Sequence, residues 1–324
     1  MLFSVVIPLY NKADTIERTI RSVWAQSFND YELIVVNDGS TDGSLNVVKE
    51  LSSEAPIVIV DKKNGGVSSA RNAGANLATG KYIALLDGDD VWYPNHLGML
   101  ANAIARCPGV KFFGSGYEWV SEKYGYYTIP WGGYRVKNIY SAFRYGQPIN
   151  SSTVAIERDL WIRIGGFVPR YSFYEDYEFF FRLGLHTKCC VIRKISGRYM
   201  RDAIESATKT HRAITSETRP HIKFLEEQIK SRTANHSMVC YAKTLVRLDW
   251  ALNTLVGIPE SAQGLKAAFP QLIAMFSPKI KCLRRIYAFL IVWCYKFRNH
   301  LIIWKKSQKA PSPASDERCL TSRM

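Results

Sequence analysis

The feature that most constrains the fold is an alternation of β-rich and helix-like segments over the first 86 residues. Apolar runs rich in β-branched residues alternate with segments whose apolar residues recur at helical spacing. The expected strands are Phe3–Ile7, Tyr31–Val36, Pro56–Val60 and Lys81–Leu86, and the expected helices between them are Asp14–Gln26, Ser44–Leu51 and Val67–Ala78. Asp14, with Glu17 three residues later, is the expected N-cap of the first helix. This order predicts an α/β domain whose largely parallel sheet is covered by helices on both faces.

Polar residues gather where the expected strands end, and such sheets bind ligands beyond the carboxyl ends of their strands. The sequence Asp87-Gly88-Asp89-Asp90 follows the fourth strand. Crowded carboxylates repel each other unless a cation joins them, so the cluster predicts a Mg²⁺ or Mn²⁺ site. The alternative is an Asp-rich turn that only caps the next helix. In the cluster Asn37–Ser44, Asp38 is a candidate acceptor for a nucleobase N–H, and the alternative is a turn that only serves backbone geometry.

A glycine turn, Asn64–Gly66, leads into a helix of small residues that carries Arg71. Exposed N–H groups at a helix start favour an anion. The alternative is a tight turn followed by a closely packed helix, and the segment lacks the GxGxxG dinucleotide fingerprint. Further along, we expect a helix at Leu97–Arg106, a strand at Val110–Trp119 and a helix at Glu175–Leu185. The aromatic stretch Tyr117–Tyr145 and the segment 150–153 are expected to bear on substrate choice.

Four motifs in this order resemble glycosyltransferase family 2, the inverting nucleotide-sugar transferases of GT-A fold. They are Val5–Asn11, Leu33–Asp42, Asn64–Gly74 and Gly80–Asp90, and the resemblance covers residues 3–200. It implies a Rossmann-like, mixed and mostly parallel sheet flanked by helices. The expected catalytic domain is 1–215, with a nucleotide-binding half at about 1–95 and an acceptor-binding half at about 96–215. A helical, basic extension at 216–306 and a disordered tail at 307–324 would follow.

The resemblance implies a role for each matching residue on the donor side. The nucleotide sugar would be bound by Pro8, Tyr10, Asp38, Arg71, Asp87 and Gly88, with Tyr10 and Asp38 at the base and Arg71 near the base and phosphates. Asp89 would ligate the Mn²⁺ or Mg²⁺ ion bound to the diphosphate. Asp90 and Trp92 would face the sugar.

A Gly-Gly-Phe segment at 165–167 and the pair Glu175-Asp176 extend the resemblance. It implies that Asp176 is the catalytic base, with Gly166 and Glu175 on the acceptor side. Without the resemblance, both acids are explained by the dipole of a helix N-terminus. Family members often carry Tyr-Arg-x-His after this helix, whereas the counterpart here, 199–202, has Asp202 in place of the histidine. Either Asp202 replaces that histidine, or the two segments do not correspond.

The chain carries 43 Lys and Arg against 28 Asp and Glu, a net charge of +15, so an anionic partner is expected. Residues 201–324 hold 21 basic and 9 acidic side chains. There, an apolar stripe from Ile286 to Trp304 is flanked by basic residues, which predicts an amphipathic helix on an anionic membrane surface. The alternative is a helix packed on the catalytic domain. No nucleic-acid-binding signature accompanies the basic residues.

Seven cysteines without a CxxC motif favour a reducing compartment, and the first residues do not resemble a secretory signal. We therefore expect a cytoplasmic protein, peripheral on the inner (plasma) membrane. With the resemblance, the expected function is inverting transfer of a hexose from a UDP-sugar to a lipid-diphosphate-linked glycan in O-antigen or capsule synthesis, such as β-1,3-glucosyl or galactosyl transfer. The alternatives are a non-catalytic nucleotide-sugar-binding scaffold on the membrane and a sugar nucleotidyltransferase.

Overall fold

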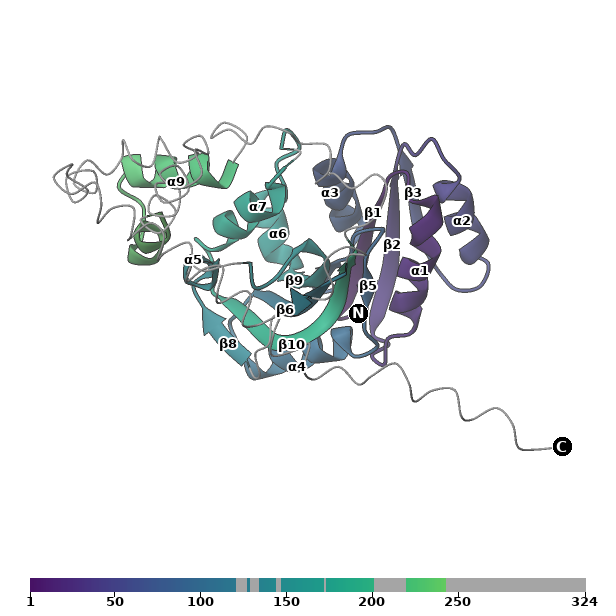
Figure 1. Cartoon of the computed structure of the whole chain (residues 1–324), viewed down its shortest axis with the longest axis horizontal. Helices are drawn as coiled ribbons and strands as arrows, with labels where there is room; N and C mark the ends of the chain where they lie inside the picture. Colours follow the sequence, from purple (N-terminus) through teal and green to yellow (C-terminus); the bar gives the residue numbers. More distant parts are fainter. Residues whose placement is uncertain (121–126, 129–133, 144–146, 172, 201–219, 243–324) are drawn as a thin grey trace, which may run out of the picture.

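The computed structural model describes residues 1–120, 127–128, 134–143, 147–171, 173–200 and 220–242 (Figure 1). Its strands are β1 (Phe3–Leu9), β2 (Tyr31–Asp38), β3 (Val58–Lys62), β4 (Tyr82–Leu85), β5 (Val91–Trp92), β6 (Phe112–Val120), β7 (Tyr127–Thr128), β8 (Tyr134–Lys137), β9 (Val154–Glu157) and β10 (Cys189–Met200). Its α-helices are α1 (Ala13–Trp24), α2 (Ser44–Leu51), α3 (Val67–Leu77), α4 (His96–Arg106), α5 (Ile139–Phe143), α6 (Arg158–Ile164), α7 (Glu175–Leu183) and α9 (Pro220–Lys230), and a 3₁₀ turn, η1, covers Ser151–Thr153.

Within the described residues the strands form one ten-stranded mixed sheet. Its order is β3-β2-β1-β4-β9-β6-β10-β5, with β7 added on β6 and β8 on β10. The first four strands are parallel to one another, and β6 and β10 are also parallel, whereas β9 runs antiparallel between β4 and β6. The predicted βαβ half is confirmed, and strands distant in sequence extend it into a GT-A-like mixed sheet.

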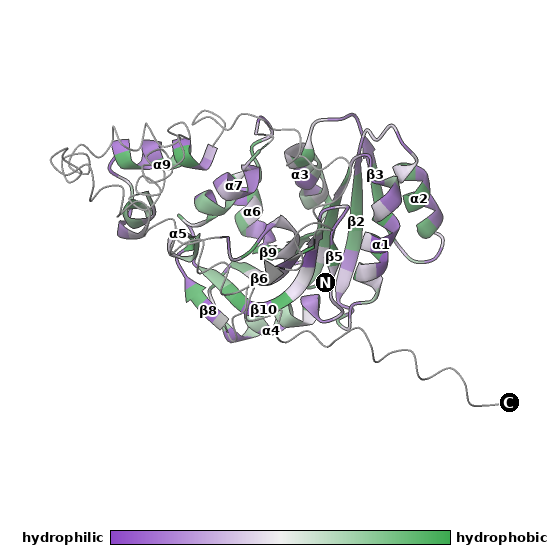
Figure 2. Cartoon of the chain, in the orientation of Figure 1, coloured by the Kyte–Doolittle hydropathy of each residue, from purple (hydrophilic) through white to green (hydrophobic). Residues whose placement is uncertain are grey.

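Side chains that alternate along the central strands enter two different cores, one on each face of the sheet. On β1, Val6 belongs to one core, while Val5 and Ile7 belong to the other. The first core is covered by α3, α6, α7 and α9, and the second by α1, α2 and α4. In Figure 2 the middle of β2 is coloured hydrophobic, whereas the neighbouring helices α1 and α2 are banded, as expected for a strand covered on both faces and for helices with one exposed side.

The start of α1 differs from the sequence-based expectation. Asp14 lies in the first turn rather than at the N-cap, which is Lys12 and makes no side-chain capping bond. The backbone N–H of Ala13 instead donates to Asp42 Oδ2 at 3.1 Å. The predicted Asp14 cap is therefore wrong, because the β2–α2 loop supplies the acceptor that α1 needs.

Helix α9, which lies within the expected extension, packs on the sheet domain. Ile222 and Leu225 of α9 are buried in the same core as Phe181 of α7. None of the helices in the described part of the chain has both the length and the apolar character needed to cross a bilayer. The predicted amphipathic stripe at 286–304, the tail at 307–324 and the boundary near 215 lie outside the described residues.

Candidate active site

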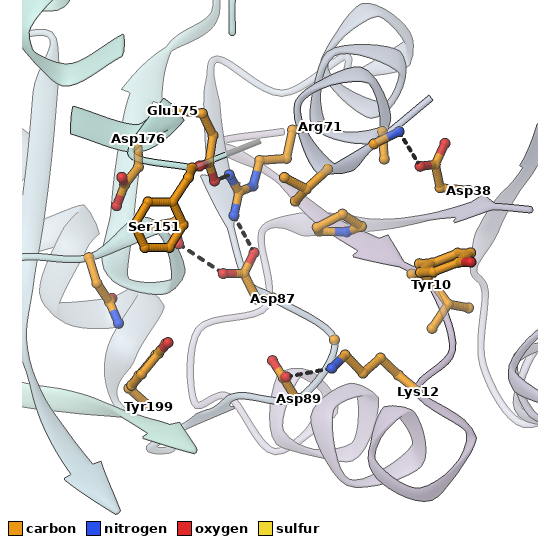
Figure 3. A pocket seen from close by; sticks show the side chains of 18 of the residues that line it. Tyr10, Lys12, Asp38, Arg71, Asp87, Asp89, Ser151, Glu175, Asp176 and Tyr199 are labelled. Atoms are coloured by element: carbon orange, nitrogen blue, oxygen red, sulfur yellow. Dashed lines mark hydrogen bonds and ion pairs between the residues drawn. The ribbon is translucent and has the colours of Figure 1, made fainter. Parts of the chain in front are cut away.

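A cavity of about 610 Å³ opens at the carboxyl ends of β1, β2 and β4, where the starts of α3 and α7 also converge (Figure 3). Most of the residues predicted to form the site line it: Pro8, Tyr10, Asp38, Arg71, Asp87, Gly88, Asp89, Glu175 and Asp176. They come from segments up to 168 positions apart, from Pro8 to Asp176. The structure thus brings the donor-side motifs and the expected base into one cavity.

Asp38, the last residue of β2, is nearly buried and holds the glycine turn in place. Its Oδ1 accepts the backbone N–H of Gly65 at 3.0 Å, and its Oδ2 accepts that of Gly66 at 2.7 Å. Lys62 forms an ion pair with the same carboxylate. Gly66 has a φ of +83°, which favours glycine, so Asp38 fixes a glycine turn at the entrance to α3 as well as lining the cavity.

Arg71 projects from α3 between two acidic residues of the cavity wall (Figure 3). Its Nη2 donates to Asp87 Oδ1 at 2.7 Å, and its Nη1 donates to Glu175 Oε1 at 2.9 Å. The side chain is 3% exposed, and its guanidinium lies 5.0 Å from the centre of the Phe167 ring. Burial lowers the pKa of Arg71, but the charges of Asp87 and Glu175 outweigh it and raise that pKa. Arg71 therefore stays charged and links the two halves of the site.

Asp87 and Asp89 lie on the turn after β4 and differ in their partners. Asp87 accepts hydrogen bonds from Arg71 and, on Oδ2, from Ser151 Oγ at 2.8 Å. Burial raises the pKa of Asp87, but Arg71 and Ser151 together hold it below its usual value. Asp89 Oδ2 lies 2.9 Å from Lys12 Nζ at the base of the cavity. Both carboxylates are thus presented to the cavity beside a cationic group.

Asp176 lies in the first turn of α7, next to Glu175. Tyr174, the residue before the helix, has a left-handed φ of +55° that turns the chain sharply into α7. Asp176 Oδ1 accepts the backbone N–H of Tyr177 at 2.8 Å. Burial and the charge of Glu175 raise the pKa of Asp176 to about 7, although Arg71 acts to lower it. A carboxyl with this pKa can accept a proton near neutral pH.

Three residues expected on the sugar and acceptor side lie behind the cavity wall instead. Asp90 is fully buried and accepts hydrogen bonds from Ser152 Oγ at 2.5 Å and the Met200 backbone N–H at 2.9 Å. Trp92 is 2% exposed and donates from Nε1 to the Ser152 carbonyl at 2.5 Å. A Cβ on Gly166 would lie 2.3 Å from Asn72 Oδ1, so this glycine permits close packing. All three support the wall rather than line the cavity.

Sequence reasoning missed several lining residues. Lys12 follows the first motif, and Ser151 lies in the polar segment to which no individual roles were assigned. Tyr199 lines the cavity from β10, whereas Asp202 lies outside the described residues. The polar segment 150–153 indicated that Ser151 could contact a substrate. No local pattern, however, indicates that the side chain of Lys12 reaches Asp89.

Comparison with known proteins agrees with this geometry. Residues 4–158 match the family described as Glycosyl transferase family 2. An uncharacterised glycosyltransferase of Nostoc sp. is 46% identical over 99 residues, 30% of this chain and 31% of the relative. One from Rickettsia prowazekii is 30% identical over 222 residues, 67% of this chain and 66% of the relative. The aligned stretch thus spans about a third of the Nostoc relative and two thirds of the Rickettsia one.

Solved structures share the fold. TarS residues 1–349 of S. aureus, in complex with UDP-GlcNAc, superpose with a TM-score of 0.67 at 18% identity, covering 95% of this chain and 92% of that one. A mannosyltransferase of Pyrobaculum calidifontis with GDP-mannose and Mn²⁺ gives 0.51 at 17% identity, covering 95% and 85%. The ordered motifs, the cavity they form and these relatives together establish that the chain belongs to glycosyltransferase family 2.

Proposed function

We propose that this glycosyltransferase moves a hexose from a UDP-sugar to a glycan hydroxyl with inversion at the anomeric carbon. The observation that carries the proposal is the position of Asp176 in the same cavity as Asp38, Asp87 and Asp89. Asp38 ends β2, and Asp87 and Asp89 follow β4 in the donor half, whereas Asp176 lies in the first turn of α7 in the other half. A donor and an acceptor entering from these two sides would meet in front of Asp176.

In the proposed reaction Asp176 removes the proton from the acceptor hydroxyl as its oxygen attacks the anomeric carbon. The bond from that carbon to the diphosphate oxygen breaks in the same displacement, and the diphosphate leaves with the bonding electrons. One general base and one displacement invert the configuration without a covalent enzyme intermediate. Arg71 and Ser151 hold Asp87 in place, and positioning of both substrates lowers the barrier further.

The carboxylates of the donor half fit a divalent cation. Mg²⁺ and Mn²⁺ take oxygen ligands and commonly bind through one or two carboxylates plus substrate phosphates and water. Among the described residues, no group of three His, Cys, Asp or Glu side chains is placed to hold a metal ion, so phosphates and water would have to supply the other ligands. Asp89 would hold the ion once Lys12 turns aside from it. When bound, the ion would neutralise charge that develops on the leaving diphosphate.

The substrate classes are proposed from the ligands of the fold neighbours and from the charge of the chain. The fold neighbours named above were solved with UDP-GlcNAc and with GDP-mannose, which supports a nucleotide-sugar donor. We propose a UDP-hexose as donor and a lipid-diphosphate-linked glycan of surface polysaccharide synthesis as acceptor. The basic stretch 261–315 supports peripheral binding to the cytoplasmic face of the membrane, and co-sedimentation with anionic against neutral vesicles tests that part.

A donor panel tests the proposal. Purified protein with Mn²⁺ or Mg²⁺ is incubated with each common nucleotide sugar and a synthetic lipid-diphosphate-N-acetylhexosamine, and released nucleotide and product mass are measured. Metal-dependent transfer from one UDP-sugar, with the inverted anomer in the product, is the expected result. Absence of both transfer and nucleotide binding would contradict it.

Two other functions make different predictions. A non-catalytic scaffold would bind the nucleotide sugar, and Asp176→Asn would change none of its properties. A sugar nucleotidyltransferase would release pyrophosphate from a nucleoside triphosphate. Its expected glycine-rich loop with Arg and Lys after the first strand is not matched by the residues 8–12. The pyrophosphate assay therefore serves as the control in the donor panel.

A further inference from the structure

Tyrosine rings wall the half of the cavity beside Asp176. Tyr117 of β6 and Tyr199 of β10 lie edge to face, with ring centres 6.5 Å apart and planes at 74°. Tyr177 of α7 faces the same cavity and packs edge to face on Tyr174 at 5.5 Å. These rings come from the sheet and from α7, so they border the same space on two sides.

Gln147 joins the two groups of tyrosines. Its Oε1 accepts the Tyr177 hydroxyl at 3.2 Å, and its backbone carbonyl accepts the Tyr117 hydroxyl at 3.5 Å. Gln147 itself lines the cavity. The hydrogen bonds therefore fix the direction of both rings before any ligand enters, which reduces the entropy that binding must overcome.

Asn150, on the same wall, has an amide nitrogen without a partner. The residue is 5% exposed, and its Oδ1 accepts the Thr153 hydroxyl at 3.0 Å, whereas its buried Nδ2 donates to no described residue. An unpaired buried donor is costly and uncommon in native proteins. Asn150 lines the cavity, but Nδ2 itself is covered, so an oxygen of a bound molecule becomes its partner when the side chain or its neighbours shift.

The charge of this half is also distinctive. The cationic residues among the described cavity lining are Lys12 and Arg71, and both are paired with carboxylates. Beside the tyrosines lie the acids Glu175 and Asp176. An anionic group placed here would meet like charge without a nearby free cation among these residues. Aromatic rings with a few amide groups are instead the lining expected of a site for a neutral, partly apolar ligand.

We propose that Tyr117, Tyr177 and Tyr199, with Gln147 and Asn150, form an acceptor subsite for a neutral pyranose. The apolar C–H face of the sugar stacks on the rings, and Asn150 Nδ2 donates to a hydroxyl or ring oxygen. A carboxylate or phosphate on the part of the sugar that enters this position is disfavoured, so the diphosphate on the anomeric carbon of a lipid-linked acceptor points out of the subsite. The inference rests on the proposed transferase function and adds the chemical class of the reacting acceptor residue.

Calorimetry on the full chain tests the subsite separately from catalysis. Binding of UDP with Mn²⁺ is measured first, and its absence would overturn the transferase proposal itself. Protein saturated with UDP and Mn²⁺ is then titrated with octyl glycosides of N-acetylglucosamine, glucose, glucuronic acid and N-acetylglucosamine 6-phosphate. We expect a neutral glycoside to bind at least roughly tenfold more tightly than either anionic one. UDP binding combined with equal or tighter binding of an anionic glycoside would overturn the subsite alone.

Variants assign the effect to the tyrosine wall. Tyr199→Ala should weaken binding of the neutral glycoside roughly tenfold while Tyr199→Phe, which keeps the ring, changes it little. Tyr10→Ala, on the donor side, should weaken UDP binding and leave the glycoside unaffected. Gln147→Lys adds a cation and should shift the preference toward the glucuronide, a gain that misfolding cannot produce. An unchanged preference in Gln147→Lys, or equal losses in Tyr199→Ala and Tyr199→Phe, would contradict the proposal.

Discussion

Arg71 Nη1 lies 2.9 Å from Glu175 Oε1, and this ion pair joins residues 104 positions apart in the chain. The same guanidinium binds Asp87 at 2.7 Å, so one buried cation connects the donor turn after β4 with the helix that carries Asp176. The family resemblance implied a contact of Arg71 with base and phosphates. Its two carboxylate partners indicate that Arg71 holds the donor half and the acceptor half of the site in a fixed relative position.

Replacing Arg71 should destabilise the protein strongly. Arg71→Met leaves Asp87 and Glu175 without their shared cation in a buried site, and removing one partner of such a pair costs about 3–5 kcal/mol. Arg21 is the matched control, because it also binds two glutamates but is 48% exposed. Arg21→Met should change the free energy of unfolding little, because exposed ion pairs are screened by water and salt. Urea unfolding measures both, and equal losses would argue against the bridging role.

Asp176→Asn should slow transfer strongly without weakening donor binding. Loss of a general base reduces the rate by about 10²- to 10⁴-fold, whereas the amide keeps the size of the side chain. Because the native fold raises the pKa of Asp176, its ionised form at pH 8 destabilises the protein, so the neutral variant should be at least as stable there. Turnover, UDP affinity and melting temperature are compared with those of the surface variant Asp14→Asn. Wild-type turnover in Asp176→Asn would assign the base elsewhere.

The rate should depend on pH near neutrality. Asp176 accepts a proton only when ionised, and its pKa is raised to about 7, so kcat/KM should fall as the pH decreases through 7. Glu175→Gln removes the negative charge next to Asp176. It also leaves Arg71 with one carboxylate partner instead of two, so more of its positive charge acts on Asp176. Both changes favour ionised Asp176, so the acidic limb should move to lower pH. A pH–rate profile of the two proteins checks this, and a limb that stays in place would show that Glu175 does not set the pKa.

Metal binding should depend on Asp89 and compete with Lys12. Asp89→Asn should weaken UDP binding in the presence of Mn²⁺ but not in EDTA, because the metal ion loses its carboxylate ligand. Lys12→Met frees Asp89 from its 2.9 Å ion pair and should strengthen Mn²⁺ binding in the absence of nucleotide. Calorimetry and the paramagnetic signal of free Mn²⁺ report both effects. The Asp89 prediction fails if both UDP affinities match the wild type, and the Lys12 prediction fails if Mn²⁺ binding is unchanged.

Two helical glycines should respond to alanine in opposite directions. A Cβ on Gly74 of α3 would lie 2.4 Å from Val6 Cγ1 of β1, so Gly74→Ala should cost about 1–3 kcal/mol through overpacking. A Cβ on Gly98 of α4 would have its nearest neighbour at 3.9 Å, so Gly98→Ala should stabilise by about 0.4–1 kcal/mol. Chemical denaturation of both variants tests the close approach of α3 to the sheet. Similar effects of the two substitutions would be inconsistent with it.

Much of the first half of the fold is predictable because its signals are local. Each βα unit is formed by consecutive residues. The observed strands and helices begin and end within a few positions of the expected ones. The end of each parallel strand places Asp38 and Asp87 at the same edge of the sheet, which local pattern and general topology predict together. The four motifs therefore predict where the cavity lies in the fold.

Local patterns in the chain specify the α/β alternation, the motifs at the strand ends and the acids in the first turn of α7, since each depends on neighbouring residues. Tertiary packing decided that Asp90 is buried while Asp87, three residues earlier, lines the cavity. It also decided that Arg71 bridges two carboxylates and that Asp42 rather than Asp14 serves the start of α1. These outcomes depend on contacts with Ser152, Glu175 and Ala13, made across long stretches of chain. The direction of a side chain and the partners that set its charge arise from packing between distant segments, for which a linear sequence carries no periodic signal.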